Sequence, residues 1–147
     1  MFKLFSALII FSLSYQAAAN SLVCANVTAR VSDAASSANP FFNLELQSPL
    51  FKKHYFFEIQ KEYFRIRCEQ TSKKIYVLLI NHFCGGSGCR DNYRIIDVES
   101  GDILLEPTSH IKNNTNEAIE IMGKKIEPFT CGEGNNEICL RSNIEIG

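Results

Sequence analysis

Residues 74–83, KIYVLLINHF, form the most continuously apolar run of the chain downstream of residue 20. The run is rich in β-branched and aromatic residues, which favour strands over helices. A strand that is covered on both faces has a run of this kind, whereas a strand with one solvated face alternates apolar and polar side chains. Residues 74–83 are therefore predicted to be the central strand of a sheet.

A short segment framed by two cysteines follows this strand directly, with the sequence Cys84-Gly85-Gly86-Ser87-Gly88-Cys89 and then Arg90-Asp91-Asn92-Tyr93. Glycine and serine are typical of turns. A disulfide between the two cysteines would close a narrow loop that protrudes from the end of the sheet. The residues after it would supply a polar and aromatic rim.

Period-two alternation recurs along the rest of the chain, as expected for strands with one buried face. The predicted strands include residues 23–31, 42–47, 55–60, 64–69 and 93–98. Further strands are expected at 103–105, after a turn at 99–102, at 118–122 with a hairpin turn at 123–125, and at 138–146. About eight short strands and no convincing amphipathic helix predict an all-β fold, a small antiparallel β-sandwich or barrel stapled by disulfides.

The first nineteen residues have the three parts of a secretory signal: a basic start at Lys3, an apolar stretch from Leu4 to Tyr15 and the small residues 17–19. Cleavage is expected after Ala19. The apolar stretch is shorter than the roughly 20 residues that span a bilayer. Residues 20–147 are then a single β domain that is periplasmic or secreted, with no stable membrane insertion.

All six cysteines lie downstream of the signal, and an even number in an exported chain predicts three disulfides. Six cysteines allow fifteen pairings. Two local pairs suggest themselves, Cys84 with Cys89 and Cys131 with Cys139, and these leave Cys24 to pair with Cys68. The long link is expected to contribute most to stability, because closing a longer loop removes more entropy from the unfolded chain.

Charge argues against a nucleic-acid partner. Without Lys3 the chain carries 14 basic and 16 acidic side chains, a net charge of −2. The basic residues are scattered singly or in pairs, which is typical of a solvated surface and not of a nucleic-acid-binding stripe.

Catalysis by the loop is not expected. Ser87, His82 and Asp91 have the residue types of a hydrolase triad, but the loop lacks the G-x-S-x-G pattern and the helix that follows it. Side chains so close in sequence rarely face one another in triad geometry. The acidic residues around the 99–102 turn are explained by solubility. The chain is therefore predicted not to be an enzyme.

A metal, redox or other cofactor is not expected either. Cys84, Cys89 and His82 lack the second ligand pair that a zinc site requires. No C-x-x-C motif is present. An exported location also favours disulfides over thiolate ligands.

A binding role explains the loop better than a catalytic or metal-binding role does, because a preformed protrusion loses little entropy on association. Arginine and tyrosine are also common at binding hot spots. The leading hypothesis is an exported binding or inhibitor-type protein that acts on another envelope or cell-wall-acting protein, by analogy with lysozyme inhibitors and immunity proteins, although none of their motifs is present. The expected binding residues are Gly85, Gly86, Ser87, Gly88, Arg90, Asp91 and Tyr93. The alternative is an envelope structural or assembly factor that acts through a sheet edge, and a small hydrolase ranks third.

Overall fold

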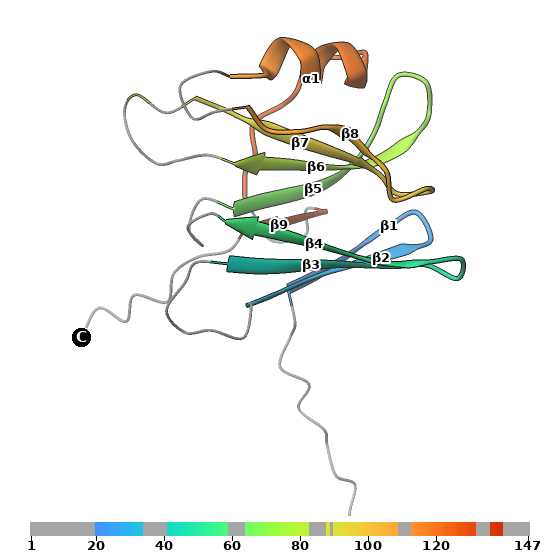
Figure 1. Ribbon diagram of the computed structural model, residues 1–147. Helices are drawn as coiled ribbons and strands as arrows, with labels where there is room; N and C mark the ends of the chain where they lie inside the picture. Colours follow the sequence, from blue (N-terminus) through green and yellow to red (C-terminus); the bar gives the residue numbers. More distant parts are fainter. Residues whose placement is uncertain are drawn as a thin grey trace, which may run out of the picture.

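The computed structural model describes residues 20–33, 41–58, 64–82, 88, 90–108, 113–131 and 136–139. These residues form nine strands and one short helix, arranged in three layers (Figure 1). The predicted signal, residues 1–19, lies outside the described residues, so its cleavage stays a prediction. Among the described residues, no helix is long and apolar enough to cross a membrane.

The first sheet is antiparallel, and its four strands follow one another in chain order. The strands are β1 (Asn20–Cys24), β2 (Val27–Asp33), β3 (Phe41–Gln47) and β4 (Lys52–Glu58). The predicted alternation in the last two is confirmed, because Leu44, Leu46, Tyr55 and Phe57 are buried while Phe56 is exposed. This sheet therefore presents one apolar face and one polar face.

The single strand predicted for residues 23–31 is wrong. The chain reverses at Ala25 and Asn26, and Cys24 pairs with Val27 across the turn. Val23 consequently points outward and is 60% exposed. The turn was missed because it lacks glycine: Ala25 itself adopts a φ of 55°, a region that alanine seldom enters. The regular spacing of valine and alanine continues through the turn and conceals it.

The second sheet contains five antiparallel strands in the order β8-β7-β6-β5-β9. The strands are β5 (Phe64–Gln70), β6 (Tyr76–His82), β7 (Tyr93–Asp97), β8 (Ile103–Leu105) and β9 (Glu137–Cys139). The central strand predicted from the apolar run is β6, and its residues from Val77 to Ile80 are fully buried. The predicted hairpin around the 99–102 turn is also confirmed.

Burial of β6 on both faces has a simple structural cause. One face of the second sheet packs against the first sheet, around Leu44, Leu46, Phe57, Leu78 and Ile80. The opposite face lies under the helix α1 (Thr115–Met122), as Figure 1 shows. A smaller apolar cluster fills that second interface and consists of Val77, Leu79, Tyr93, Ile95, Ala118 and Met122.

Helix α1 corrects the hairpin predicted at residues 118–125. Ala118 and Met122, four positions apart, lie on the helix face that packs on the sheet. Gly123 does not form the predicted hairpin turn. It ends the helix instead, with a φ of 65° and a hydrogen bond of 2.8 Å from its N–H to the Ile119 carbonyl.

Two of the three predicted disulfides fall within the described residues, and both are confirmed. Cys24 bonds to Cys68 and Cys131 bonds to Cys139. The first bond joins β1 to β5, so it links the two sheets and does not tie strands within one sheet. Cys84 and Cys89 lie outside the described residues. Disulfides are typical of an oxidising, extracytoplasmic environment.

The fold is therefore mostly β, as predicted, with α1 as the exception in the described part of the chain. The two sheets stay separate and the strands do not close into a barrel.

Candidate functional site

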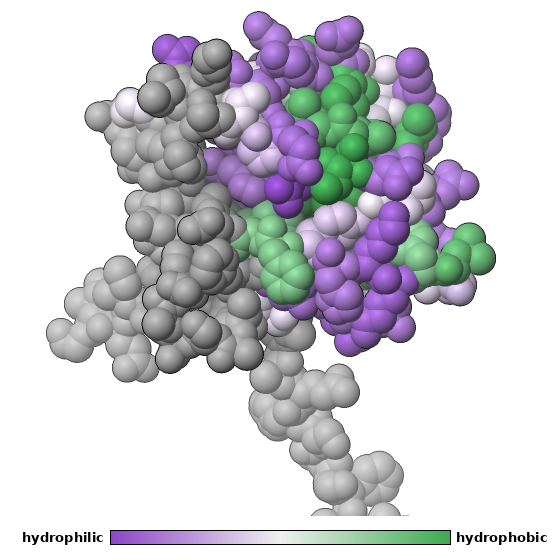
Figure 2. Space-filling model, viewed as in Figure 1, coloured by the Kyte–Doolittle hydropathy of each residue, from purple (hydrophilic) through white to green (hydrophobic). Residues whose placement is uncertain are grey.

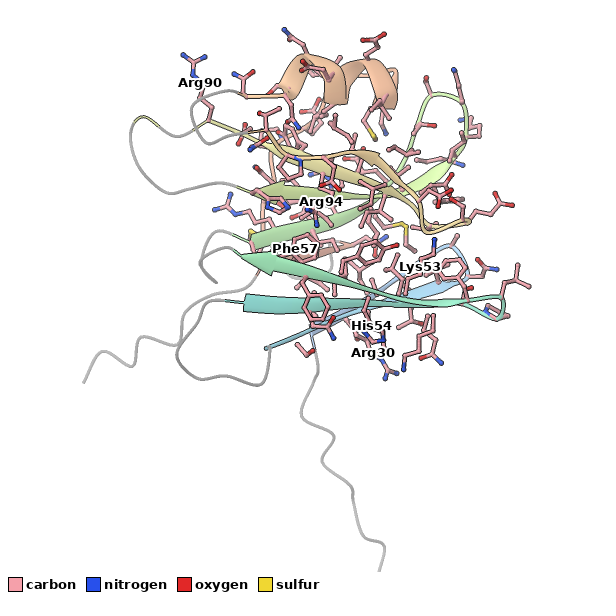
Figure 3. All side chains as sticks on the ribbon, viewed as in Figure 1. Arg30, Lys53, His54, Phe57, Arg90 and Arg94 are labelled. Atoms are coloured by element: carbon pink, nitrogen blue, oxygen red, sulfur yellow. A yellow bond between two sulfur atoms is a disulfide. The ribbon has the colours of Figure 1, made fainter. Side chains whose placement is uncertain are left out.

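The predicted loop connects the end of β6 to the start of β7. Gly85, Gly86 and Ser87 lie outside the described residues, together with the two cysteines that frame them. Gly88, Arg90 and Asp91 are described and exposed. Figure 3 shows the Arg90 side chain pointing away from the body of the protein.

The base of this loop is held by a network of buried asparagines. The Asn81 side chain donates to Asp91 Oδ1 at 2.9 Å and accepts from the Asn92 N–H at 3.3 Å. The His82 N–H donates to the Asn92 carbonyl at 2.8 Å. The Asn92 side chain in turn donates to the Thr108 carbonyl at 2.6 Å and accepts from the Thr108 N–H at 2.9 Å. Because satisfied buried polar networks are rigid, the loop starts from a fixed base.

Tyr93 does not belong to the exposed rim, since only 5% of it is accessible. Burial is the main cause that raises its pKa to about 12, and the charge of Asp91 and a hydrogen bond to it add to the effect. Its backbone N–H and carbonyl both bind the side chain of Asn114, each at 2.7 Å. Asn92 is buried as well, so the rim predicted for residues 90–93 is reduced to Arg90 and Asp91.

Two of the three residues considered for a hydrolase triad make structural contacts. The His82 ring lies against Phe57 and Phe64, with centroid distances of 5.3 and 6.4 Å. Asp91 accepts from Asn81. Ser87 lies outside the described residues, so its geometry relative to them is not defined.

The acidic residues around the β7–β8 hairpin hold the hairpin in place. Asp97 accepts from the Glu99 N–H at 2.8 Å, and Glu106 pairs with Arg94 at 2.9 Å. Lys53 of β4 reaches across to Asp102 at 3.4 Å and to the Ser100 carbonyl at 3.0 Å. These contacts fasten the first sheet to a turn of the second.

A hydroxyl contributes to the same link. Tyr55 of β4 donates a hydrogen bond to the Gly101 carbonyl. Burial raises the pKa of Tyr55, and the nearby Asp102 carboxylate raises it further, while Arg94 lowers it.

One group of potential metal ligands occurs in the described part of the chain. Cys131, Glu137 and Cys139 place their ligand atoms within 4.8 Å of one another. The two sulfurs are bonded to each other, however, and Glu137 binds Arg67 at 3.0 Å and the Cys131 N–H at 3.0 Å. All three residues therefore use their potential ligand atoms in structural bonds within the protein.

Arg67 is the centre of that structural cluster. It is buried, pairs with Glu69 and Glu137, and donates to the Glu127 and Pro128 carbonyls at 2.8 and 3.2 Å. Its guanidinium also lies 4.4 Å from the centre of the Phe129 ring. The cluster fastens the segment after α1 to β5.

The structure also contains a cleft that the sequence did not predict. It has a volume of about 310 Å³ and lies where the β1–β2, β3–β4, β5–β6 and β7–β8 turns meet. Its lining consists of Ala25, Asn26, Val27, Ser48, Leu50, Lys74, Ile75, Tyr76, Val98 and Glu99. Strand β6 runs from this cleft to the loop, so the two sites lie at opposite ends of the sheets, roughly 20 Å apart for a strand of this length.

Apolar side chains reach the surface at the cleft. Leu50 is 88% exposed, Tyr76 is 43% exposed, and Ile75 is also exposed. Figure 2 shows apolar surface at this hairpin end of the molecule, on the right of the view, and a second apolar area below α1. The local sequence feature that could have indicated this cleft is Leu50, an apolar residue at the tip of the turn that begins with Ser48 and Pro49.

Comparisons of the chain with protein-family models, with curated proteins and with solved structures found no match.

Proposed function

We propose that the protein is an exported binding protein of the inhibitor type, which presents the β6–β7 loop to another envelope or cell-wall-acting protein. The observation that carries this proposal is the buried hydrogen-bond network beneath the loop, centred on Asn81 and Asn92. In this proposal the two sheets form a β-sandwich scaffold with the loop at one end. Lysozyme inhibitors and immunity proteins are the functional analogues.

A fixed base favours binding for an energetic reason. Ordering a mobile segment on association costs free energy, and a loop that is fastened at both ends avoids part of this cost. Arg90 extends from that base, and no described residue forms an ion pair with it. Arginine is a frequent hot-spot residue, so Arg90 is the described side chain best placed to anchor a partner.

The chemistry of the described residues supports binding over hydrolysis. His82 packs on aromatic rings, and Asp91 serves the loop base. These contacts give both side chains a structural role at the base of the loop.

The edge of the second sheet supports one alternative. β8 is an edge strand, and its residues Ile103 and Leu104 are exposed. An exposed apolar edge strand can pair with a strand of another chain. The second candidate function is therefore an envelope assembly factor that binds through β8.

Affinity capture from envelope extract tests the two candidates side by side. The bait is the oxidised mature chain, compared with Arg90→Glu, with Gly86→Trp combined with Ser87→Trp, and with Leu104→Lys. Lys125→Glu is the matched control, since it reverses an exposed charge after α1.

The proposal expects a partner that the parent and Lys125→Glu retain and that both loop variants lose. Loss in Leu104→Lys alone would establish the edge-strand alternative. A partner retained by all variants, or no partner at all, would reject the loop as the binding site. Circular dichroism of each bait would show that the fold is intact.

A further inference from the structure

The cleft at the hairpin end has the composition of a small-ligand site. Its floor contains Val27 and Val98, which are almost completely buried, and its walls contain Leu50, Ile75 and Tyr76. Its volume of about 310 Å³ lies at the lower end of the range for ligand pockets, ~300–1,000 Å³. The cleft therefore admits a molecule of a few residues and not a folded domain.

The exposed apolar wall is held in place. The Ser48 hydroxyl accepts from the N–H groups of Leu50 and Phe51 at 3.1 and 3.0 Å, which fixes the β3–β4 turn. Leu50 thus stays exposed on a rigid turn, although nothing in the described part of the chain covers it. When a ligand covers an apolar side chain that is held in this way, the burial of its apolar surface stabilises the complex.

Backbone conformation gives a second, independent observation. Among the described residues, three other than glycine have a positive φ, and two of them, Ala25 at 55° and Lys74 at 66°, line the cleft. Such conformations cost about 1–3 kcal/mol each and are concentrated at functional sites. Hydrogen bonds from the Lys74 N–H to the Thr71 carbonyl at 2.9 Å and from Gln70 to the Lys74 carbonyl at 3.2 Å maintain the strained turn.

Two opposite charges come to the cleft from different turns. Lys74 belongs to the β5–β6 turn, and Glu99 belongs to the β7–β8 turn. Neither forms an ion pair with another residue of the described chain. A ligand that carries both a carboxylate and an ammonium group would complement them.

We propose that the cleft binds a short zwitterionic peptide with an apolar side chain. Lys74 binds the carboxylate of this peptide, Glu99 binds its ammonium group, and Leu50, Ile75 and Tyr76 cover the apolar side chain. This site is separate from the β6–β7 loop, and its test does not depend on the function proposed for the loop.

The probe is the dipeptide leucyl-phenylalanine, titrated into the ¹⁵N-labelled oxidised mature chain and followed by NMR. Its N-acetyl and C-amide forms remove one charge each. The variants are Leu50→Ser, Lys74→Met and Glu99→Gln. Phe56→Ser is the matched control, because it removes an aromatic side chain that is 71% exposed and lies outside the cleft.

Saturable shifts are expected at the cleft, with unchanged affinity in Phe56→Ser and weaker affinity in Leu50→Ser. Capping either end should weaken binding about two- to fivefold, the value of one exposed ion pair. N-acetylation should lose its effect in Glu99→Gln, and amidation should lose its effect in Lys74→Met, because the partner charge is then gone.

Equal affinity for the free and capped peptides would overturn the proposal, as would charge effects that persist in both charge variants. The absence of saturable shifts at the cleft would also overturn it.

Discussion

Replacing Cys24 and Cys68 together by alanine should destabilise the protein more than replacing Cys131 and Cys139. The first disulfide joins the two sheets across a sequence separation of 44 residues, and the second closes a separation of 8. A crosslink stabilises mainly by reducing the entropy of the unfolded chain, and this effect grows with the length of the closed loop.

The chain-entropy relation gives the size of each effect. It assigns about 4 kcal/mol at 25 °C to the Cys24–Cys68 link and about 2.5 kcal/mol to the Cys131–Cys139 link. Domains are typically stable by about 5–15 kcal/mol, so loss of the longer link removes a large share of the total. The lost packing of Cys24, which is fully buried in the core between the sheets, adds to this cost.

Guanidinium unfolding of the oxidised parent and of the two double variants would measure the difference. The chain has no tryptophan, so far-UV circular dichroism is the appropriate signal. The free energy of unfolding should fall by at least about 1.5 kcal/mol more in Cys24→Ala/Cys68→Ala than in Cys131→Ala/Cys139→Ala. The m-value should rise as well, because the uncrosslinked unfolded chain exposes more surface.

Equal losses in the two variants would refute this reasoning. A larger loss for Cys131→Ala/Cys139→Ala would also refute it, and would show that local strain or residual unfolded structure outweighs loop length.

Three further predictions concern single residues. Asn114→Ala should cost about 3 kcal/mol or more, because it leaves the buried N–H and carbonyl of Tyr93 unpaired; denaturant unfolding would measure this. The folded state keeps the Tyr93 proton up to about pH 12, whereas the unfolded chain loses it near the ordinary pKa of 10.0. The free energy of unfolding should therefore fall as the pH rises through this range, and Tyr93→Phe should remove that part of the fall and one late step from the absorbance titration at 295 nm. Gly123→Ala should cost about 2 kcal/mol or more, because φ is 65° and the new Cβ would lie 1.9 Å from the Ser72 hydroxyl; Ser72→Gly in the same chain should recover only the part due to the clash, as thermal unfolding would show.

Local patterns were sufficient for most strands and for the Cys131–Cys139 disulfide. The unbroken apolar run at 74–83 identified β6 because only a strand covered on both faces tolerates such a sequence. Alternation identified β3, β4 and β5, since one face of each is buried. The pairing of Cys131 with Cys139 followed from proximity. Cys24 and Cys68 remained for each other only because Cys84 was also assigned to Cys89, a pairing that lies outside the described residues.

The sequence-based predictions fail where a short pattern fits two structures, or where a contact distant in sequence decides the outcome. Residues 118–122 contain isoleucine at alternate positions, which favours a strand, and also Ala118 and Met122 four positions apart, which favours a helix. The helix forms because the face of the second sheet that points away from the first sheet is apolar, and α1 buries it. The prediction that Tyr93 lies on an exposed rim is wrong because nothing local shows that Asn114, 21 residues away, binds the Tyr93 backbone.

The sequence by itself determined the position of most strands and the pairing of Cys131 with Cys139, because each of these depends on residues close together in the chain. Only the tertiary structure decided that α1 covers the second sheet, that asparagines fasten the loop base and that four turns enclose a cleft. Each of those turns only connects two strands that are neighbours in sequence, and none forms a cleft by itself. The cleft exists because two sheets packed face to face bring the turns to one end, and this arrangement depends on contacts between residues far apart in sequence.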